Sequence, residues 1–396
     1  MKLRKRFFKE LIVVVVAFLS QVSEAQVSYE RILNAGDEPQ NWLTYNGGYM
    51  SQRHSLLQQI DRNNVNQLEL KWVLQNQVFG AWQSNPIIVD GIMYVTERPN
   101  SVMAVDAVTG RVFWKYRHQN ADNALVCCGA NNRGVAVLND KVYMGTLDAH
   151  LVALDRINGQ LLWKAEVGDV NLAYSVTMAP LAVKDKIMVG VGGGEFGIRG
   201  YVAAFDAETG EQVWKTYTIP GPGEPNHDSW EGDDWEHGGA PVWITGSFDS
   251  ELNLTYWGVG NPGPDWNAGQ RPGDNLYSDS AIALDADTGE LKWYFQFTPN
   301  DAYDYDSVQV PVLADIEWRG EAKKVMMWAN RNGYFYVLDR TNGQFLVGKP
   351  YVKVNWSSGL DENGRPIPSP QPEGMPTYPG NQGGTNWYPP SFSPST

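Results

Sequence analysis

Two adjacent cysteines, Cys127 and Cys128, are the only cysteines in the 396-residue chain. Residues 1–25 have the composition of an export signal, so we expect the mature chain in a compartment where thiols oxidise. There the two thiols bond to each other, bond to another chain or stay free, with buried free thiols as the plainest alternative. A bond between neighbours would close a strained ring, and proteins keep such strain mainly at functional sites. That ring would also offer a flat apolar surface to a planar ligand.

Three aspartates, Asp301, Asp304 and Asp306, form a second candidate cluster. In an extended segment, Asp304 and Asp306 point to the same side. Two carboxylates on one face repel each other unless water or a cation separates them. A solvated acidic loop is the alternative. The interleaved Tyr303 and Tyr305 favour partial burial instead, and buried carboxylates need a counter-charge.

A third candidate is the glycine-rich segment 192–197, which matches the pattern G-x-G-x-x-G. It is a weak dinucleotide signature because it lies between two strand-like runs, 187–191 and 201–205, with no helix after it. We expect instead a close backbone approach to a ligand, with Glu195 projecting toward a central channel. Asn261, in the turn Gly-Asn-Pro, is a further oxygen donor. Carboxylate and amide oxygens suit calcium or a similar large cation.

Other chemical motifs are missing from the sequence. The chain has no Cys-x-x-Cys-His motif for covalent haem and no Gly-x-Ser-x-Gly nucleophile elbow. The spacing of its histidines is not that of a paired metal site, and we retain only His237, in the expected loop 221–239, as a candidate. The five histidines are His54, His118, His150, His227 and His237.

The elements that must position these residues are repeats. Five segments share small or apolar residues, then Asp, three residues, Gly and soon an aromatic residue. Each Asp-x-x-x-Gly predicts a tight turn between two short strands, with the aromatic residue packed across that turn. Periods near 50 residues with several strands each indicate β-propeller blades, and a β-sandwich with chance likeness is the alternative. The repeats run from Asp106 to Trp114, Asp155 to Trp163, Asp206 to Trp214, Asp285 to Trp293 and Asp339 to Phe345.

Composition restricts the partners. The expected signal, residues 1–25, carries five basic and two acidic residues, so its removal changes the formal net charge from −14 to −17. An acidic chain is a poor candidate for nucleic-acid binding. The apolar run 11–19 is too short to span a bilayer, and no later stretch is apolar enough to do so.

Taken together, these motifs resemble those of the quinoprotein alcohol dehydrogenases, the methanol and ethanol dehydrogenase family that uses pyrroloquinoline quinone (PQQ). The resemblance implies an all-β fold, an eight-bladed β-propeller with tryptophan-docking repeats. Residues 26–396 would form its N-terminal part, about five blades, with the remaining blades missing, since the Pro- and Gly-rich sequence after Gly364 shows no closing strand. The motifs are residues 127–128, 132–134, 194–200, 260–264, 271–275, 301–306 and 330–333.

The resemblance also implies a role for each position. Cys127 and Cys128 would form a vicinal disulfide on one face of PQQ, with Trp243 stacked on the other face. Asp304 would be the general base, and Arg331 would bond the reactive quinone carbonyl. The other expected cofactor contacts are Gln83, Arg133, Thr177, Gly193, Gly194 and Asn386, and the expected metal ligands are Glu195, Asn261, Asp304 and Asp306.

The implied reaction is the periplasmic oxidation of a small primary alcohol to an aldehyde. The metal acts as a Lewis acid on the quinone, Asp304 takes the hydroxyl proton, and hydride passes to PQQ. Electrons then leave to an external acceptor, which we expect to be a separate cytochrome c or a domain beyond residue 396. Members of the family that use lanthanides have Asp two positions after the base, where Asp306 stands here. An additional negative ligand favours a trivalent ion, so we expect a lanthanide rather than Ca²⁺.

Three positions depart from the methanol enzymes: Gln83 replaces Glu, Gly192 replaces a hydroxyl residue, and Asp265 is inserted before Trp266. Because that tryptophan lines the family's substrate cavity, we expect an enzyme for a broader range of primary alcohols. One alternative is a non-enzymatic exported propeller scaffold, and another is a quinoprotein for sugars or polyols. A homodimer is a further expectation.

Overall fold

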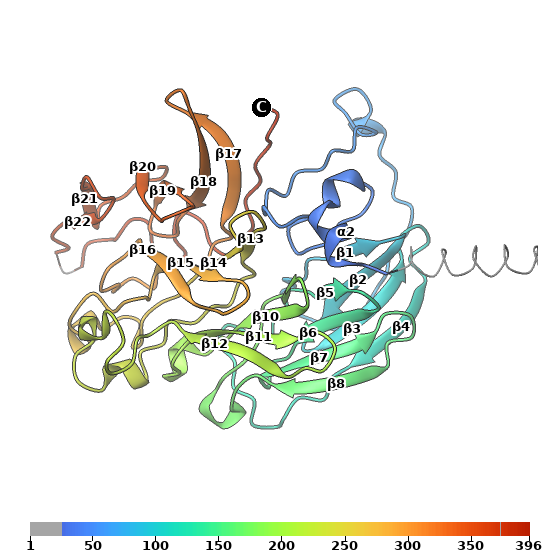
Figure 1. Ribbon diagram of the computed structural model, residues 1–396, viewed down its shortest axis with the longest axis horizontal. Helices are drawn as coiled ribbons and strands as arrows, with labels where there is room; N and C mark the ends of the chain where they lie inside the picture. The colour runs from blue at the N-terminus through green and yellow to red at the C-terminus, as the bar shows by residue number, and fades with distance from the viewer. Residues whose placement is uncertain (1–25, 373) are drawn as a thin grey trace, which may run out of the picture.

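The computed structural model describes residues 26–372 and 374–396, and its regular structure is almost entirely β-strand. The expected export signal lies outside the described residues. Five four-stranded antiparallel sheets and one two-stranded sheet are present among the described residues. Figure 1 shows the sheets following one another in chain order, from β1–β4 through β9–β12 to β17–β20. This architecture confirms the predicted all-β class.

Each four-stranded sheet keeps its strands in sequence order, so it is built from successive hairpins. The strands are β1 Ile87–Val89, β2 Ile92–Glu97, β3 Ser101–Asp106, β4 Val112–Arg117; β5 Ala136–Leu138, β6 Lys141–Gly145, β7 His150–Asp155, β8 Leu161–Glu166; β9 Leu181–Val183, β10 Lys186–Gly190, β11 Tyr201–Asp206, β12 Gln212–Tyr217; β13 Ser247–Asp249, β14 Leu254–Gly258, β15 Ser280–Asp285, β16 Leu291–Gln296; β17 Val312–Trp318, β18 Glu321–Ala329, β19 Tyr334–Asp339, β20 Phe345–Pro350; and, in the small sheet, β21 Ser357–Leu360 and β22 Pro366–Pro368.

Helices are few and short among the described residues. The α-helix α2 spans Tyr29–Leu33, and the 3₁₀ helices are η1 Ala35–Asp37, η2 Val65–Gln67, η3 Val170–Leu172, η4 Gly194–Phe196, η5 His227–Ser229, η6 Asp234–Glu236 and η7 Ala268–Gln270. Within the ranges that the structure covers, none of these helices is long and apolar enough to cross a membrane. The expected loop at 221–239 is confirmed, since it contains only η5 and η6 between β12 and β13.

The repeat motif makes the turn that the sequence predicts. In the first sheet, the N–H of Gly110 donates to the carbonyl of Asp106 at 2.8 Å, closing the turn between β3 and β4. The carboxylate of Asp106 accepts the N–H of Val108 at 2.9 Å, which satisfies a second donor. Gly110 has φ +74°, a conformation that other residues adopt at a cost, so glycine is favoured at this position.

The prediction that each aromatic residue packs across its own turn is wrong. Trp114 on β4 packs against Gly159, in the turn of the following sheet, and its Nε1 donates to the carbonyl of Arg156 at 3.1 Å. Strand side chains stand perpendicular to their own sheet, so this indole faces the neighbouring sheet instead of its own hairpin. Trp214 and Trp293 repeat the contact with the carbonyls of Ala286 and Arg340, at 3.3 and 3.2 Å.

The hairpin order determines where the loops meet. Two kinds of connection leave such a sheet from the same end. One joins the second strand to the third, and the other joins the fourth strand to the next sheet. All the candidate site residues between residues 127 and 331 lie in connections of these two kinds. The Asp-x-x-x-Gly turns lie at the opposite end. Among the described residues after Gly364, the one further strand is β22, which pairs with β21. The N–H of Phe392 donates to the carbonyl of Gln52 at 2.8 Å.

Candidate active site

A cavity of about 330 Å³ opens where these loops meet, a volume typical of small-ligand sites. Twelve of the fourteen residues expected from the sequence line it: Gln83, Cys127, Cys128, Arg133, Thr177, Gly193, Glu195, Trp243, Asp304, Asp306, Arg331 and Asn386. The other two lie directly behind the wall. Asn261 is fully buried, and its N–H donates to Oδ1 of Asp306 at 2.9 Å. A Cβ placed on Gly194 would lie 3.2 Å from Oδ1 of Asn261.

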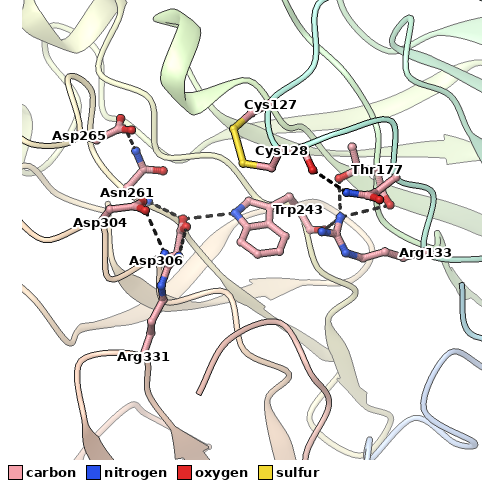
Figure 2. Close-up of a disulfide and its surroundings, with 11 residues drawn as sticks. Cys127, Cys128, Arg133, Thr177, Trp243, Asn261, Asp265, Asp304, Asp306 and Arg331 are labelled. Carbon is pink, nitrogen blue, oxygen red and sulfur yellow. Dashed lines mark hydrogen bonds and ion pairs between the residues drawn. A yellow bond between two sulfur atoms is a disulfide. The ribbon is translucent and has the colours of Figure 1, made fainter. Parts of the chain in front are cut away.

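The two cysteines are bonded to each other, which excludes the alternative of free thiols. They lie in the loop between β4 and β5, where Nδ2 of Asn131 donates to the carbonyl of Cys128 at 3.0 Å. Figure 2 shows the disulfide on one side and the ring of Trp243 below it. The cavity is therefore bounded by two flat, weakly polar surfaces.

Arg133 supplies positive charge beside this slot. Its guanidinium lies 4.7 Å from the centre of the Trp243 ring, and Nη1 donates to Oγ1 of Thr177 at 2.8 Å. Burial lowers the pKa of Arg133 to about 10, and its Nε is buried without a hydrogen-bond partner. No described carboxylate lies within ion-pair distance of it. A buried cation without a counter-charge is a site for an anionic ligand.

The aspartate cluster has the counter-charge that the sequence predicts, and it is Arg331. Its Nη2 lies 2.9 Å from Oδ2 of Asp304, and its Nη1 lies 2.6 Å from Oδ2 of Asp306. The expectation of an extended segment is wrong, because Asp304 has φ +60° and the segment lies outside any strand. The bend lets both carboxylates reach one guanidinium. Burial, then the charge of Asp306, raises the pKa of Asp304 to about 8.

Glu195 and Asn261 are the other two metal ligands expected from the sequence. The Glu195 side chain lines the cavity. Burial by the surrounding wall, followed by the charge of Asp306, raises the pKa of Glu195 to about 7. Oδ1 of Asn261 is buried without a hydrogen-bond partner, while its Nδ2 donates to Oδ1 of Asp265 at 2.7 Å. Crowded carboxyls with raised pKa values and an unpartnered amide oxygen fit a hard cation.

A family model described as "Glucose/ethanol/alcohol dehydrogenase, beta-propeller domain", for PQQ, matches residues 42–366. The chain belongs to the PQQ-dependent alcohol dehydrogenase family. It is 39% identical to the quinoprotein alcohol dehydrogenase PedH of Pseudomonas putida over 99% of this chain and 71% of the relative. It is 38% identical to the lanthanide-dependent methanol dehydrogenase of Methylacidiphilum fumariolicum, over 93% of this chain and 65% of the relative.

Solved structures agree with this assignment. A europium-containing methanol dehydrogenase superposes with a TM-score of 0.88 at 37% identity, covering 92% of this quinoprotein and 69% of that chain. The quinohemoprotein alcohol dehydrogenase of Comamonas testosteroni superposes with a TM-score of 0.86 at 39% identity, covering 94% and 60%. This quinoprotein thus spans about half to seven-tenths of the length of the relatives that it matches.

The residues of the quinoprotein fit both groups that the family binds. A planar PQQ would lie between the disulfide and Trp243, with its carboxylates toward Arg133 and Thr177. A cation would lie among Glu195, Asn261 and the two aspartates. Gly260 makes this cluster feasible, because a Cβ there would collide with Oδ1 of Asp306.

Two residues of the cavity, Asn381 and Trp387, were not expected from the sequence, and one expected candidate, His237, lies elsewhere. Asn381 accepts hydrogen bonds from Arg331 through its carbonyl, at 2.8 Å from Nε, and Trp387 lies 5.8 Å from Arg133. Both belong to the segment that also carries Asn386, whose side chain lines the cavity. His237 does not line the cavity; its Nδ1 lies 3.0 Å from the carbonyl of Gly197.

Proposed function

We propose that this quinoprotein binds PQQ and one metal ion and oxidises small primary alcohols to aldehydes. The observation that carries the proposal is that Asp304 lines the same cavity as Glu195 and Asp306, together with the disulfide and Trp243. The names of the relatives support alcohols as the substrate class. We further propose a periplasmic location and a cytochrome c as electron acceptor.

In this proposal Asp304 is the general base. Arg331 holds Oδ2 of Asp304, so Oδ1 is the oxygen that takes the hydroxyl proton. Next to a bound cation the Asp304 carboxyl would lose its proton at neutral pH, ready to accept another. Arg331 also keeps Asp304 and Asp306 at fixed positions on its two Nη atoms. When bound, PQQ supplies the hydride acceptor and the cation polarises it.

The proposed cation is a lanthanide rather than Ca²⁺. Three carboxylates, Glu195, Asp304 and Asp306, line the cavity, and only Arg331 offsets their charge within ion-pair distance among the described residues. Strongly negative oxygen sites favour a hard trivalent ion. The carboxylate of Asp306 accepts hydrogen bonds from the N–H of Asn261, from Trp243 and from Arg331. An affinity for La³⁺ equal to or below that for Ca²⁺ would overturn this part of the proposal.

The test is reconstitution of the purified chain with PQQ and La³⁺ or Ca²⁺. Ethanol-dependent reduction of an artificial electron acceptor should require both additions. Asp304→Asn should lower the rate by at least about 10²-fold, while the exposed Asp228→Asn should not change it. Quenching of tryptophan fluorescence by PQQ should persist in Asp304→Asn.

If PQQ binds but no alcohol is oxidised, the alcohol assignment fails. If PQQ does not bind, the site assignment fails. A scaffold role does not account for the uncompensated charge of Arg133 or for the unpartnered Oδ1 of Asn261. Faster turnover of a sugar or polyol than of ethanol would instead favour the carbohydrate alternative.

A further inference from the structure

Two histidines and an aspartate meet outside the cavity. His118 directly follows β4 of the first sheet, whereas Asp148 and His150 lie at the turn between β6 and β7 of the second sheet. Nε2 of His118 lies 2.9 and 3.1 Å from the two oxygens of Asp148, and Nδ1 of His150 lies 3.4 Å from Oδ1. These atoms all lie within 4.8 Å of one another. The cluster therefore joins two successive sheets.

Hydrogen bonding leaves one nitrogen of this cluster without a partner. Nδ1 of His150 is buried and has no hydrogen-bond partner, although it faces the carboxylate. The side chains of His118 and Asp148 are only 6% and 4% exposed. Among residues 26–372 and 374–396, no Lys or Arg pairs with Asp148. A buried carboxylate needs a counter-charge, which a bound cation would supply.

The same geometry fits a metal ion. Two ligand atoms bound at about 2.05 Å to one tetrahedral ion are about 3.3 Å apart, close to the separations in this cluster. A metal-binding imidazole normally uses its other nitrogen in a hydrogen bond, and Nδ1 of His118 lies 3.4 Å from the hydroxyl of Tyr116. The carboxylate is oriented as well, by Oγ1 of Thr146 at 2.6 Å and by the N–H of Ala121 at 3.1 Å.

We propose that His118 Nε2, His150 Nδ1 and a carboxylate oxygen of Asp148 bind one divalent transition-metal ion of the Zn²⁺ type. Imidazole with carboxylate suits Zn²⁺, Co²⁺ or Ni²⁺, whereas the oxygen ligands of the cavity suit a hard ion, so the two sites select different metals. Three protein ligands leave a fourth position for water. The ion would fix the turn at Asp148, which holds Ala121 at the start of the loop that carries the disulfide.

The test uses the chain without a polyhistidine tag, saturated with La³⁺ so that the cavity ligands are occupied, and then titrated with Co²⁺. We expect one Co²⁺ per chain, with visible ligand-field absorption that Zn²⁺ abolishes by displacement. His150→Gln should weaken Co²⁺ binding by more than about tenfold. His54→Gln, at an exposed histidine far from the cluster in sequence, is the matched control and should leave it unchanged.

Equal Co²⁺ affinity in His150→Gln and the parent chain, or no stoichiometric binding, would overturn the proposal. His150→Gln is the decisive variant because Nδ1 of His150 makes no hydrogen bond whose loss could unfold the chain. Circular dichroism of both variants checks that the fold is retained. His118→Gln should weaken binding in the same way if its circular dichroism matches that of the parent.

Discussion

The indole N–H of Trp243 donates to Oδ1 of Asp306 at 3.3 Å (Figure 2). The ring proposed to stack on PQQ is therefore bonded to a carboxylate proposed to hold the cation. The same oxygen accepts the N–H of Asn261 at 2.9 Å. Asp306 thus links the planar slot to the proposed cation site. A substitution in the slot should therefore change cation binding, and a substitution at the cation site should change PQQ binding.

Trp243→Phe tests this link, because it keeps a flat ring but removes the N–H. A hydrogen bond to a charged group contributes about 1.5–3 kcal/mol, so La³⁺ affinity should change by about tenfold or more. PQQ binding, measured by fluorescence quenching, should be largely retained. The control is Trp318→Phe, at a half-buried tryptophan at the end of β17 that does not line the cavity, which should leave La³⁺ affinity as it was. An unchanged affinity in Trp243→Phe would show that the bond does not matter for the cation.

Asp306→Asn tests the choice of metal. The substitution removes one negative charge but keeps an oxygen near the N–H of Asn261. The loss should weaken La³⁺ binding more than Ca²⁺ binding, because the interaction scales with the charge of the ion. The ratio of the two affinities, measured by isothermal titration calorimetry, should fall by about tenfold or more. A ratio equal to that of the parent chain would mean that Asp306 does not select the ion.

Asp265 is the third residue to test. Its carboxylate accepts a hydrogen bond from Nδ2 of Asn261 at 2.7 Å, and this bond turns Oδ1 of Asn261 toward the proposed cation site. Asp265→Ala should lower cation affinity by about 10–100-fold, as the loss of outer-shell partners does. Asp265→Asn keeps an acceptor oxygen and should restore most of the affinity. If both variants bind the cation equally weakly, Asp265 contributes its negative charge and not the orientation of Asn261.

The sequence predicted the sheets well because each repeat is local: Asp106 and Gly110 close their turn within five residues. It also predicted most of the cavity lining, since the resemblance fixes those positions one by one. The direction of Trp114 was not predictable from the repeat, because its partner lies in the next sheet. Likewise His118 and His150 are 32 positions apart, and only the packing of two sheets brings them to one carboxylate.

Asp279 allows a test of stability against pH. It is fully buried, and neither carboxylate oxygen has a hydrogen-bond partner among the described residues. Burial, followed by the charge of Asp301, raises the pKa of Asp279 well above its usual range. Above about pH 4 the unfolded chain releases this proton while the folded chain keeps it, so the folded state loses stability as the pH rises.

Asp279→Asn should remove that loss. Between pH 5 and pH 7 the free energy of unfolding of the parent should fall relative to that of the variant, by up to about 1.4 kcal/mol per pH unit. Urea denaturation at both pH values measures the difference, with the exposed Asp228→Asn as control. A difference that stays constant, or that grows in favour of the parent, would contradict a protonated Asp279.

The docking of each tryptophan on the next turn can be separated from backbone strain with two glycines. Gly210 has φ +75°, and a Cβ there would lie 2.7 Å from Cε3 of Trp163. Gly223 has φ +82° but no heavy atom within 4 Å of such a Cβ. Gly223→Ala should therefore cost only the strain of the left-handed backbone, about 1–2 kcal/mol.

Gly210→Ala should cost the same strain plus the displacement of the Trp163 ring, which adds about 1–3 kcal/mol. Thermal and urea unfolding of the two variants measures the difference directly. Because backbone strain is common to both, a larger loss in Gly210→Ala isolates the contact between neighbouring sheets. Equal losses would mean that the indole moves aside freely, and that the sheets are not held together through this contact.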